Sequence, residues 1–424
     1  MNINIPYGKG FQTLNVPDHR LRAVLTPAHG ETAQADQQEL VLRALQEPIG
    51  SLPLHELAKD KQRIVLITSD HTRPVPSALT LPLYLSEIRR GNPGAEITIL
   101  VATGVHRATT EAELRQKFGD GIVDNERIVV HNADADDLVM MGILPSGGEL
   151  WLDRLVAEAD LVISEGFVEP HFFAGFSGGR KSILPGVAGR KTIMYNHNAG
   201  FIAHPGSRQG SLETNPIHRD MVFAAQTARL AFILNVILDS DKRVAAAFAG
   251  DPVKAHEAAC ECCRAMTSVR AVEADIIVTS NSGYPLDQNI YQCTKGLSTG
   301  EACVREGGVI ILCAGLSDGH GGADFYHWFA DRTNAQEVLR DIENIPPDET
   351  IMDQWQAQIH ARVMKKAFCI IVSPEENREM LEAMHMGWAP TADDALAMAT
   401  GMLGENASVT VIPDGVGVIV EADV

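Results

Sequence analysis

Residues 63–74 consist of Arg63-Ile-Val-Leu-Ile-Thr-Ser-Asp-His-Thr-Arg-Pro74, a short apolar run followed directly by a polar loop. The run Arg63–Thr68 is nearly continuous in apolar character, as expected for a strand that is covered on both faces of a sheet. The loop after it carries Asp70 and Arg73, and prolines restrict its backbone. The same unit, a buried strand followed by a polar loop, recurs along the chain and decides the fold class.

Further apolar runs rich in Val and Ile follow the first. They are Glu96–Ala102, Arg127–His131, Asp160–Ser164, Ala231–Leu238, Ala274–Thr279, Val309–Cys313, Phe368–Val372 and Ser408–Ile412. Helical patterns fit between many of them. Thr110-x-x-Glu113 is a capping box that predicts a helix through Lys117, Asp251-Pro252 predicts one to Met266, and Ser373-Pro374 predicts one through Met384. Alternating strands and helices predict an α/β protein with mainly parallel sheets.

The length of 424 residues predicts two or three domains. A cysteine-rich helix ends near residue 267, and a second series of strands and helices begins near residue 275. We therefore expect an N-terminal α/β domain over residues 1–268 and a smaller C-terminal α/β domain over residues 269–424. Polar loops follow strands in both halves, and ligands bind at that edge of parallel sheets. An active site in a cleft between two closing domains is expected.

Composition excludes several classes of protein. The net charge of −20 argues against nonspecific binding to nucleic acid or to an anionic membrane, although a few local cations can still hold a small anion. The longest apolar run, Leu230–Leu238, is far shorter than the roughly 18–20 residues of a membrane span. The seven cysteines do not resemble a disulfide framework, and no signal peptide begins the chain. A cytoplasmic protein with reduced thiols is expected.

The loop Gly175-Phe-Ser-Gly-Gly-Arg-Lys-Ser182 is close to the phosphate-binding pattern G-x-x-x-x-G-K-[ST]. Arg180 replaces the last glycine, and Pro185-Gly186 interrupts the helix that would follow, so a nucleotide-hydrolysing enzyme is only an alternative. The backbone at Gly178 and Gly179 can still bind a phosphate or carboxylate.

Aromatic residues surround the lysine of this loop. Phe172, Phe173 and Phe176 should be buried, which indicates a packed site rather than a flexible surface loop. A lysine in such surroundings can lose solvation and become a nucleophile or a covalent anchor, and Lys181 is the candidate.

Three histidines also lie in candidate site loops: His106, His171 and His197. A single histidine is more often structural, but three in such loops favour a function. No short metal-ligand spacing such as H-E-x-x-H is present. The residues by themselves therefore predict an interdomain site for an anionic small molecule and leave the reaction open.

Six segments carry a resemblance to a known family. They are Ser69-Asp-His-Thr-Arg-Pro74, Ala102-Thr-Gly-Val-His-Arg107, Glu169-Pro-His-Phe-Phe-Ala-Gly-Phe-Ser-Gly-Gly-Arg-Lys181, Tyr195-Asn-His197, Asn215-Pro-Ile-His218 and Tyr291-Gln-x-x-Lys295. In this order they resemble the nickel-pincer-nucleotide-dependent lactate racemase family. The segment ending at Lys181 is the most specific of them.

The resemblance implies roles for individual residues. Lys181 would hold the pyridinium-dithio mononucleotide through a thioamide, and His197 would be the protein ligand of Ni(II), whose planar site the pincer completes. His106 and His171 would be paired acid/base groups. The implied substrate-binding residues are Asp70, Arg73, Tyr291, Gln292, Lys295 and Trp355.

The implied activity is that of an isomerase, a racemase or epimerase of a 2-hydroxy acid. Hydride would leave Cα and return to the other face of a 2-keto acid. Cofactor-maturation proteins are implied as partners, while the hydroxy acid and the oligomeric state stay open. Two other classes remain: a phosphate- or nucleotide-handling enzyme that uses the Gly175–Ser182 loop, and a non-catalytic protein that binds an organic anion.

Overall fold

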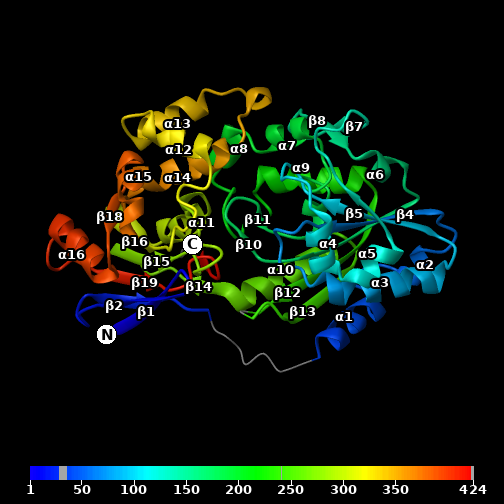
Figure 1. The fold of residues 1–424 in the computed structure, drawn as a ribbon, viewed down its shortest axis with the longest axis horizontal. Coiled ribbons are helices and arrows are strands. Elements are labelled where there is room, and N and C mark those ends of the chain that lie inside the picture. Colours follow the sequence, from blue (N-terminus) through cyan, green and yellow to red (C-terminus); the bar gives the residue numbers. More distant parts are fainter. Residues whose placement is uncertain (28–35, 240, 422–424) are drawn as a thin grey trace. The chain divides into compact units, whose positions relative to one another are not determined.

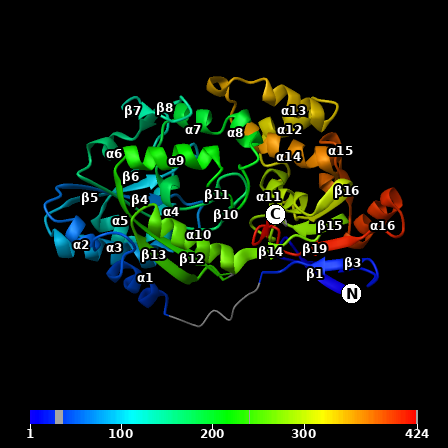
Figure 2. The same ribbon diagram turned by 180° about the vertical axis from the view of Figure 1, so that it is seen from behind.

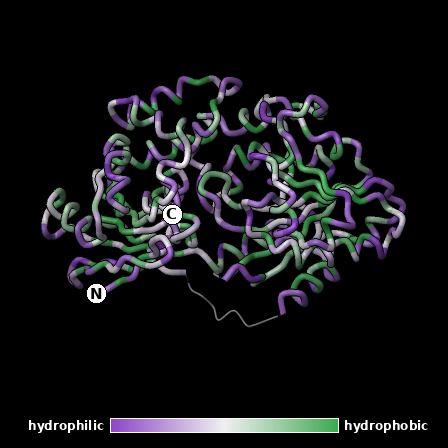
Figure 3. Tube along the Cα trace, in the orientation of Figure 1, coloured by the Kyte–Doolittle hydropathy of each residue, from purple (hydrophilic) through white to green (hydrophobic). Residues whose placement is uncertain are grey.

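The computed structural model describes residues 1–27, 36–239 and 241–421 (Figure 1). Its contacts divide the chain into two compact units. The first contains the described residues of 1–28, 198–203 and 266–424, and the second contains those of 29–197 and 204–265. Each unit is built around one six-stranded sheet, and hydrophobic stretches follow the strands of both sheets (Figure 3).

The second unit contains the strands that precede most of the candidate site loops. Its sheet has the order β13-β12-β9-β4-β5-β6, and all neighbours are parallel except β12 and β13. The strands are β4 (Arg63–Ser69), β5 (Glu96–Ala102), β6 (Arg127–Val130), β9 (Leu161–Phe167), β12 (Leu230–Leu238) and β13 (Val244–Gly250). Two hairpins accompany them: β7 (Val139–Ile143) with β8 (Glu149–Leu152), and β10 (Pro170–His171) with β11 (Gly175–Phe176).

Helices cover this sheet (Figure 1, and from behind in Figure 2). They are α1 (Gln37–Gln46), α2 (Leu54–Leu57), α3 (Ser77–Gly91), α4 (Glu111–Phe118), α5 (Asp120–Asn125), α6 (Arg154–Glu158), η1 (Gly179–Ser182), α7 (Arg190–Asn196), α9 (Pro216–Thr227) and α10 (Lys254–Thr267). Side chains of α1, α2, α3 and α4 share one hydrophobic core with alternate residues of the strands, such as Leu66 and Ile99. Apolar burial on this scale is the main force that holds the layers together.

The first unit repeats the α/β design. Its sheet has the order β18-β17-β16-β15-β19-β3, and every pair is parallel. The strands of the unit are β1 (Asn2–Tyr7), β2 (Gly10–Asn15), β3 (Leu21–Val24), β14 (Ser268–Arg270), β15 (Ala274–Ser280), β16 (Val304–Cys313), β17 (Phe368–Val372), β18 (Gly387–Ala389), β19 (Val409–Ile412) and β20 (Ile419–Glu421).

Its helices lie over both faces of that sheet. They are α8 (Ala199–Ala203), α11 (Ile290–Glu301), α12 (Ala323–Ala330), α13 (Ala335–Glu343), η2 (Pro347–Glu349), α14 (Gln354–Lys366), η3 (Glu375–Asn377), α15 (Arg378–Ala383) and α16 (Ala392–Leu403). One core joins the sheet to α11–α14, and a second joins its other face to α16 and the β1–β2 hairpin.

The α/β class and all the predicted strands are confirmed, with ends that differ by at most a few residues. The capping box of Thr110 and Glu113 is present, and the Asp251 carboxylate accepts from the first amides of its helix. The helix expected from Ser373 is different. Pro374 is extended, so a 3-10 turn at Glu375–Asn377 comes first and the α-helix begins only at Arg378.

The boundary at residues 268/269 implied two consecutive segments. The compact units differ from this expectation, because each is assembled from separate stretches of the chain. Residues 1–27 belong with the C-terminal strands, because β3 pairs with β19 and the β1–β2 hairpin covers one face of that sheet. Residues 198–203 belong there too, where Gln358 donates to the carbonyl of Ala199 at 2.8 Å. Both attachments depend on pairing between distant segments, which local patterns do not encode.

The seven cysteines are thiols rather than disulfide partners, and six of them are buried. Burial raises the pKa of Cys260 and Cys313 to about 12, so these thiols stay protonated at neutral pH. Within the described residues, no helix has both the length and the apolar character needed to cross a membrane.

The buried His360 of helix α14 makes the free energy of unfolding depend on pH. Burial lowers the pKa of His360 to about 3, and its Nδ1 lies 2.9 Å from Oγ1 of Thr294. The unfolded chain binds the proton near the ordinary histidine pKa of 6.5, so this contribution to stability is complete above that pH and is lost as pH falls toward 3. Each pH unit in that window is worth up to about 1.4 kcal/mol.

We predict that His360→Asn makes the free energy of unfolding less dependent on pH below pH 6.5. Asparagine keeps an acceptor for Thr294 but cannot titrate. Between pH 6 and pH 4 the variant's free energy of unfolding should fall by about 2–3 kcal/mol less than that of the parent. Urea unfolding at several pH values measures this difference. Equal falls in the two proteins would contradict the assignment.

Candidate active site

The site loops of the second unit leave the carboxyl edge of its sheet at a topological switch point. From β4 the chain continues to β5 and β6 on one side, whereas β9 pairs with the other side of β4. Neighbouring loops diverge at such a point and leave room for a ligand. The loop after β4 carries Asp70 and Arg73, the loop after β5 carries His106, and the segment after β9 carries His171 and Lys181.

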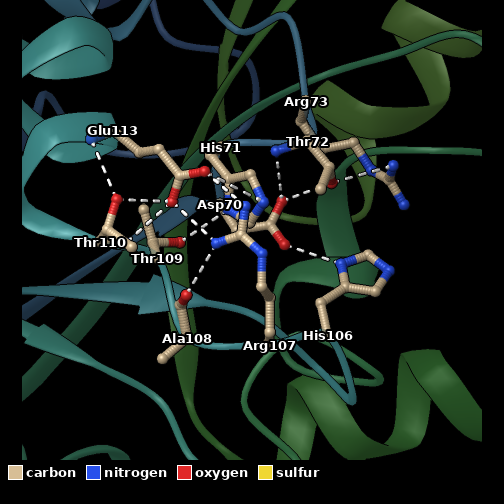
Figure 4. Close-up of polar contacts among 10 residues, drawn as sticks. All are labelled: Asp70, His71, Thr72, Arg73, His106, Arg107, Ala108, Thr109, Thr110 and Glu113. Carbon is tan, nitrogen blue, oxygen red and sulfur yellow. Dashed lines mark hydrogen bonds and ion pairs between the residues drawn. The ribbon is translucent and has the colours of Figure 1, made fainter.

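Asp70 and His106 form a hydrogen-bonded pair between the first two loops (Figure 4). Nδ1 of His106 lies 2.7 Å from Oδ2 of Asp70, whose other oxygen accepts from the amide and hydroxyl of Thr72 at 3.1 and 2.6 Å. Burial alone raises the pKa of Asp70, but the bonds from His106 and Thr72 outweigh it and lower the pKa below its ordinary value. An ionised Asp70 accepts from Nδ1–H, so the lone pair of a neutral His106 is on Nε2.

The segment after β9 folds back on itself as the β10–β11 hairpin. The Ser177 hydroxyl closes it, since it donates to the carbonyl of Phe167 and accepts from the amide of Glu169, both at 2.9 Å. The buried Arg180 fixes the turn from within, because its guanidinium donates to the carbonyl of Ala174 at 2.7 Å. It also donates to the carbonyls of Ser177 and Gly178.

The Arg180 guanidinium therefore bonds to the backbone of its own loop and is not available to bind an anion. His256 lies 3.0 Å from its Nη1, and Sγ of Cys260 lies 3.5 Å from the same histidine nitrogen. Desolvation lowers the pKa of Arg180 to about 10, which still leaves the guanidinium charged at neutral pH. The resemblance of this loop to a phosphate-binding loop thus has a structural cause: its arginine holds the backbone of the loop.

Phe173 stands at the centre of the three residues expected to hold the cofactor and exchange protons. Its ring meets His171 edge-on at a centroid distance of 4.6 Å and His197 edge-on at 5.2 Å. Nζ of Lys181 lies 5.7 Å from the same centroid and 3.5 Å from Nε2 of His171. Phe173 and Phe176 are buried as expected, whereas Phe172 is only half-buried, and the contacts of Phe173 bring His171, Lys181 and His197 together.

The electrostatic surroundings of Lys181 favour its neutral amine. Burial, together with the positive charges of Arg180 and Arg73, lowers the pKa of Lys181 well below its ordinary value. A neutral lysine amine is a nucleophile, whereas an ammonium ion is not. The loss of solvation predicted from the sequence is therefore found at this lysine.

His197 ends helix α7 and is 5% exposed. Its Nδ1 lies 2.9 Å from the carbonyl oxygen of Ile193, which identifies Nδ1 as the protonated nitrogen and places the lone pair on Nε2. Burial and the nearby Lys181 lower the pKa of His197 to about 3, so the ring is neutral. Neutral imidazole with one nitrogen fixed by a carbonyl is the usual state of a histidine metal ligand.

Gly178 and Gly179, expected to bind the cofactor through their amides, lie against β12. The amide of Gly179 donates to Oδ1 of Asn235 at 2.8 Å. Asn235, the polar residue that interrupts the apolar run 230–238, is thus an anchor of the loop. A contact of the two glycines with a cofactor stays a prediction.

Gly178 also requires the absence of a side chain. It has φ 74° and ψ −175°, and an added Cβ would lie 2.6 Å from Oδ1 of Asn235 and 2.9 Å from the carbonyl oxygen of Phe167. Gly119 is a matched control with φ 83°, ψ 154° and no atom within 4 Å of its added Cβ.

We predict that both Gly119→Ala and Gly178→Ala lose about 1–3 kcal/mol of stability through backbone strain. Gly178→Ala should lose about 1–3 kcal/mol more, because the methyl group overpacks the loop. Chemical unfolding of the two variants measures this difference. Equal stability of the two variants would show that the close approach of the loop to β12 adds no cost to a side chain at position 178.

The remaining expected site residues lie in the first unit. Asn289 caps helix α11 by accepting from the amide of Gln292 at 2.9 Å, and α11 carries Tyr291 and Lys295 one turn apart. The Tyr291 hydroxyl donates to Asp353 at 2.7 Å, just before α14 and the buried Trp355. The structure thus brings Tyr291 to the start of the helix that carries Trp355.

Two functional features were missed from the sequence. Phe173 was expected to be buried, but not to contact three site residues. Glu165 follows a strand signal, yet no pattern showed that its buried carboxylate accepts from Thr68, Ser77 and Thr80 at 2.5–2.6 Å. Hydroxyl residues at Thr68, Ser77 and Thr80 were the only available signal, and such residues are common at strand ends and helix starts.

Two family descriptions match the chain. Residues 7–210 match the lactate racemase N-terminal domain, and residues 269–420 match the lactate racemase C-terminal domain. The chain belongs to the lactate racemase family. It is 49% identical over 421 residues to the lactate racemases of Thermoanaerobacterium thermosaccharolyticum and Lactiplantibacillus plantarum, with 99% of each chain covered.

One solved structure agrees with this assignment, and a second shows the same fold. The lactate racemase apoprotein from T. thermosaccharolyticum superposes with a TM-score of 0.97 over 99% of this chain and 100% of that chain. A Thermotoga maritima protein shares the fold at 16% identity, with a TM-score of 0.61 over 91% of this chain and 97% of that chain.

Proposed function

We propose that the protein is an isomerase that racemises lactate or a closely related 2-hydroxy acid. The observation that carries this proposal is the group of His171, Lys181 and His197 around Phe173, in a chain that is 49% identical to two lactate racemases over nearly its full length. The reaction inverts Cα by moving a hydride away and back, through a 2-keto acid. Direct removal of the Cα proton is disfavoured because that hydrogen is weakly acidic next to a carboxylate.

The residues fit the nickel pincer nucleotide that we propose as cofactor. Lys181 offers an amine whose pKa is lowered by burial, which favours the neutral form that suits a thioamide bond to the pyridinium-dithio mononucleotide. His197 offers a neutral imidazole with its lone pair on Nε2, a suitable single protein ligand for Ni(II). The described residues contain no cluster of three or more His, Cys, Asp or Glu able to hold a metal, so further donors would come from the nucleotide.

When bound, this cofactor accepts and returns the hydride, and the protein supplies the proton transfers. His106 accepts the hydroxyl proton at Nε2, because Asp70 fixes its other nitrogen as the donor. The negative charge of Asp70 also stabilises the imidazolium that forms. General base catalysis of this kind contributes about 10²–10⁴-fold to the rate.

His171 has the opposite arrangement. The amide of Ala174 donates to its Nδ1 at 3.2 Å, so the proton of neutral His171 is on Nε2, the nitrogen nearest Lys181. In one direction of the reaction neutral His106 would accept the hydroxyl proton, and His171, as an imidazolium, would return a proton from Nε2 to form the hydroxyl of the opposite enantiomer. Enantiomers present their hydroxyl groups to different sides, and racemisation needs an acid/base group for each.

Arg73 is the proposed partner of the substrate carboxylate. It is exposed, and a guanidinium binds a carboxylate with two parallel hydrogen bonds. We propose that Tyr291, Gln292, Lys295 and Trp355 act on the same substrate, with Lys295 adding a second positive charge. Loading of the cofactor would require separate maturation proteins.

Chiral chromatography tests the function. Protein loaded by co-expressed maturation proteins is incubated with single enantiomers of lactate and of other 2-hydroxy acids, including sugar acids. We expect each lactate enantiomer to give the other. If intact-mass measurements show a loaded protein that inverts none of these acids, the proposal is wrong and a non-catalytic anion-binding protein replaces it.

A further inference from the structure

Helix α4 lies beside the loop that carries Asp70 and Arg73. Its capping box, Thr110 and Glu113, starts the helix directly after the His106 loop (Figure 4). Lys117 follows Glu113 by four residues, so both side chains lie on one face of the helix. That face meets the loop after β4 at two points.

The first point is the side chain of Lys117. Its ammonium donates to the carbonyl oxygen of Arg73 at 2.8 Å, and the carbonyl oxygen of Val75 lies 3.5 Å away. Lys117 is half-buried, and burial lowers its pKa below the ordinary value. A lysine that gives up hydration to bond backbone carbonyls fixes the peptide that it touches.

The second point is Glu113. Its carboxylate lies 3.7 Å from Nε2 of His71, and the other nitrogen of His71 lies 3.1 Å from Oγ1 of Thr109 (Figure 4). The same carboxylate accepts two bonds from Arg107, next to His106. Glu113 thus links the loops of Asp70 and His106.

The ends of the Arg73 loop are fixed separately. The buried carboxylate of Glu165 accepts from Thr68 at the end of β4 and from Ser77 and Thr80 at the start of α3. In the middle of the loop the amide of Arg73 donates to the carbonyl of Asp70 at 3.3 Å, and α4 adds the Lys117 bond to the Arg73 carbonyl. The exposed guanidinium of Arg73 donates to Oγ1 of Thr72 at 3.3 Å, so the backbone of the loop and this side-chain bond together set where the charge lies.

We propose that Lys117 is a positioning residue for Arg73: it holds the Arg73 carbonyl so that the guanidinium meets the substrate carboxylate. The proposal rests on the proposed function. Without the Lys117 bond, Arg73 must be ordered when the substrate binds, and that cost raises KM. Chemistry after binding changes less, because Lys117 does not touch the reacting atoms.

The test is Lys117→Met, which keeps the length and apolar stem of the side chain but cannot donate. Lys366→Met is the matched control, because Lys366 also donates to a backbone carbonyl, that of Glu301 at 2.7 Å, at the far end of α14 from Trp355. In loaded protein we expect Lys117→Met to raise KM for lactate about 5–20-fold and to lower kcat less than 3-fold. Lys366→Met should change neither.

A double-mutant cycle shows whether Lys117 acts through Arg73. In an Arg73→Ala background, Lys117→Met should change KM less than 2-fold, because the side chain it positions is gone. The same 5–20-fold effect in both backgrounds, or an unchanged KM in the single variant, would overturn the proposal. Lys117→Gln serves if Lys117→Met is poorly folded, with the same expectations.

Hydrogen exchange separates this proposal from the function. Amides of residues 70–73 and 75 should exchange at least 5-fold faster in Lys117→Met than in the parent, with or without cofactor, whereas those of β4 should not change. Unchanged exchange in the loop would overturn the positioning role even if turnover fell. A parent protein that does not racemise lactate would instead contradict the proposed function, while the exchange result still decides whether Lys117 holds the loop.

Discussion

Lys181→Ala is expected to abolish attachment of the cofactor and all racemisation. Lys181 is the lysine beside Phe173 and His171, and burial with the charges of Arg180 and Arg73 lowers its pKa, which favours the nucleophilic neutral amine. Alanine removes the only atom that can form the thioamide in this account. Intact-protein mass spectrometry after expression with maturation proteins measures the loss of the adduct, and chiral chromatography measures the loss of turnover.

Lys191→Ala is the matched control for that experiment. Lys191 lies ten residues further on, is exposed, and pairs with Glu149 at 2.8 Å. A surface ion pair of this kind contributes little to stability. The control should be loaded and active like the parent. Full racemisation by Lys181→Ala would refute the covalent role of Lys181.

Replacing either member of the histidine pair should spare attachment and remove turnover. We expect His106→Ala and His171→Ala each to carry the adduct and to lose about 10²–10⁴-fold in kcat, the range for loss of a positioned acid or base. Asp70→Asn should lose about 10²-fold or more, because an amide cannot support the same tautomer and charge on His106. Kinetics normalised to the loaded fraction measure these effects.

His327→Ala provides the comparison, since His327 is exposed on α12, pairs with Asp331 one turn further on and meets the ring of Tyr326 edge-on. Its kcat should equal that of the parent. A loaded His106→Ala protein with undiminished kcat would show that another group accepts the proton, and the roles assigned to the pair would have to change.

The strands could be predicted because their signal is local. A run such as Phe368–Val372 is buried on both faces and contains almost only apolar residues, so composition alone marks it. The pairing of β3 with β19 could not be predicted, because its partners are separated by most of the chain. For the same reason the sequence could not show that residues 1–27 pack with the C-terminal strands.

The site was partly predictable for a related reason. Lys181, His171 and His197 lie in one distinctive segment or near it, and the structure brings them together around Phe173. The direction of Arg180 could not be predicted, because a guanidinium next to glycines can bind an anion or its own backbone with equal chemical sense. Only the positions of the carbonyls of Ala174 and Ser177 decide between the two.

The protein is expected to invert Cα by a hydride transfer in which the hydrogen on Cα does not exchange with solvent. Loaded protein converts L-lactate in D₂O, and nuclear magnetic resonance and mass spectrometry then measure deuterium at Cα of the D-lactate formed. We predict that the original hydrogen is retained and that deuterium at Cα stays at background. Deuterium at Cα in most of the D-lactate would mean that a proton is removed and replaced from solvent, and would contradict the account.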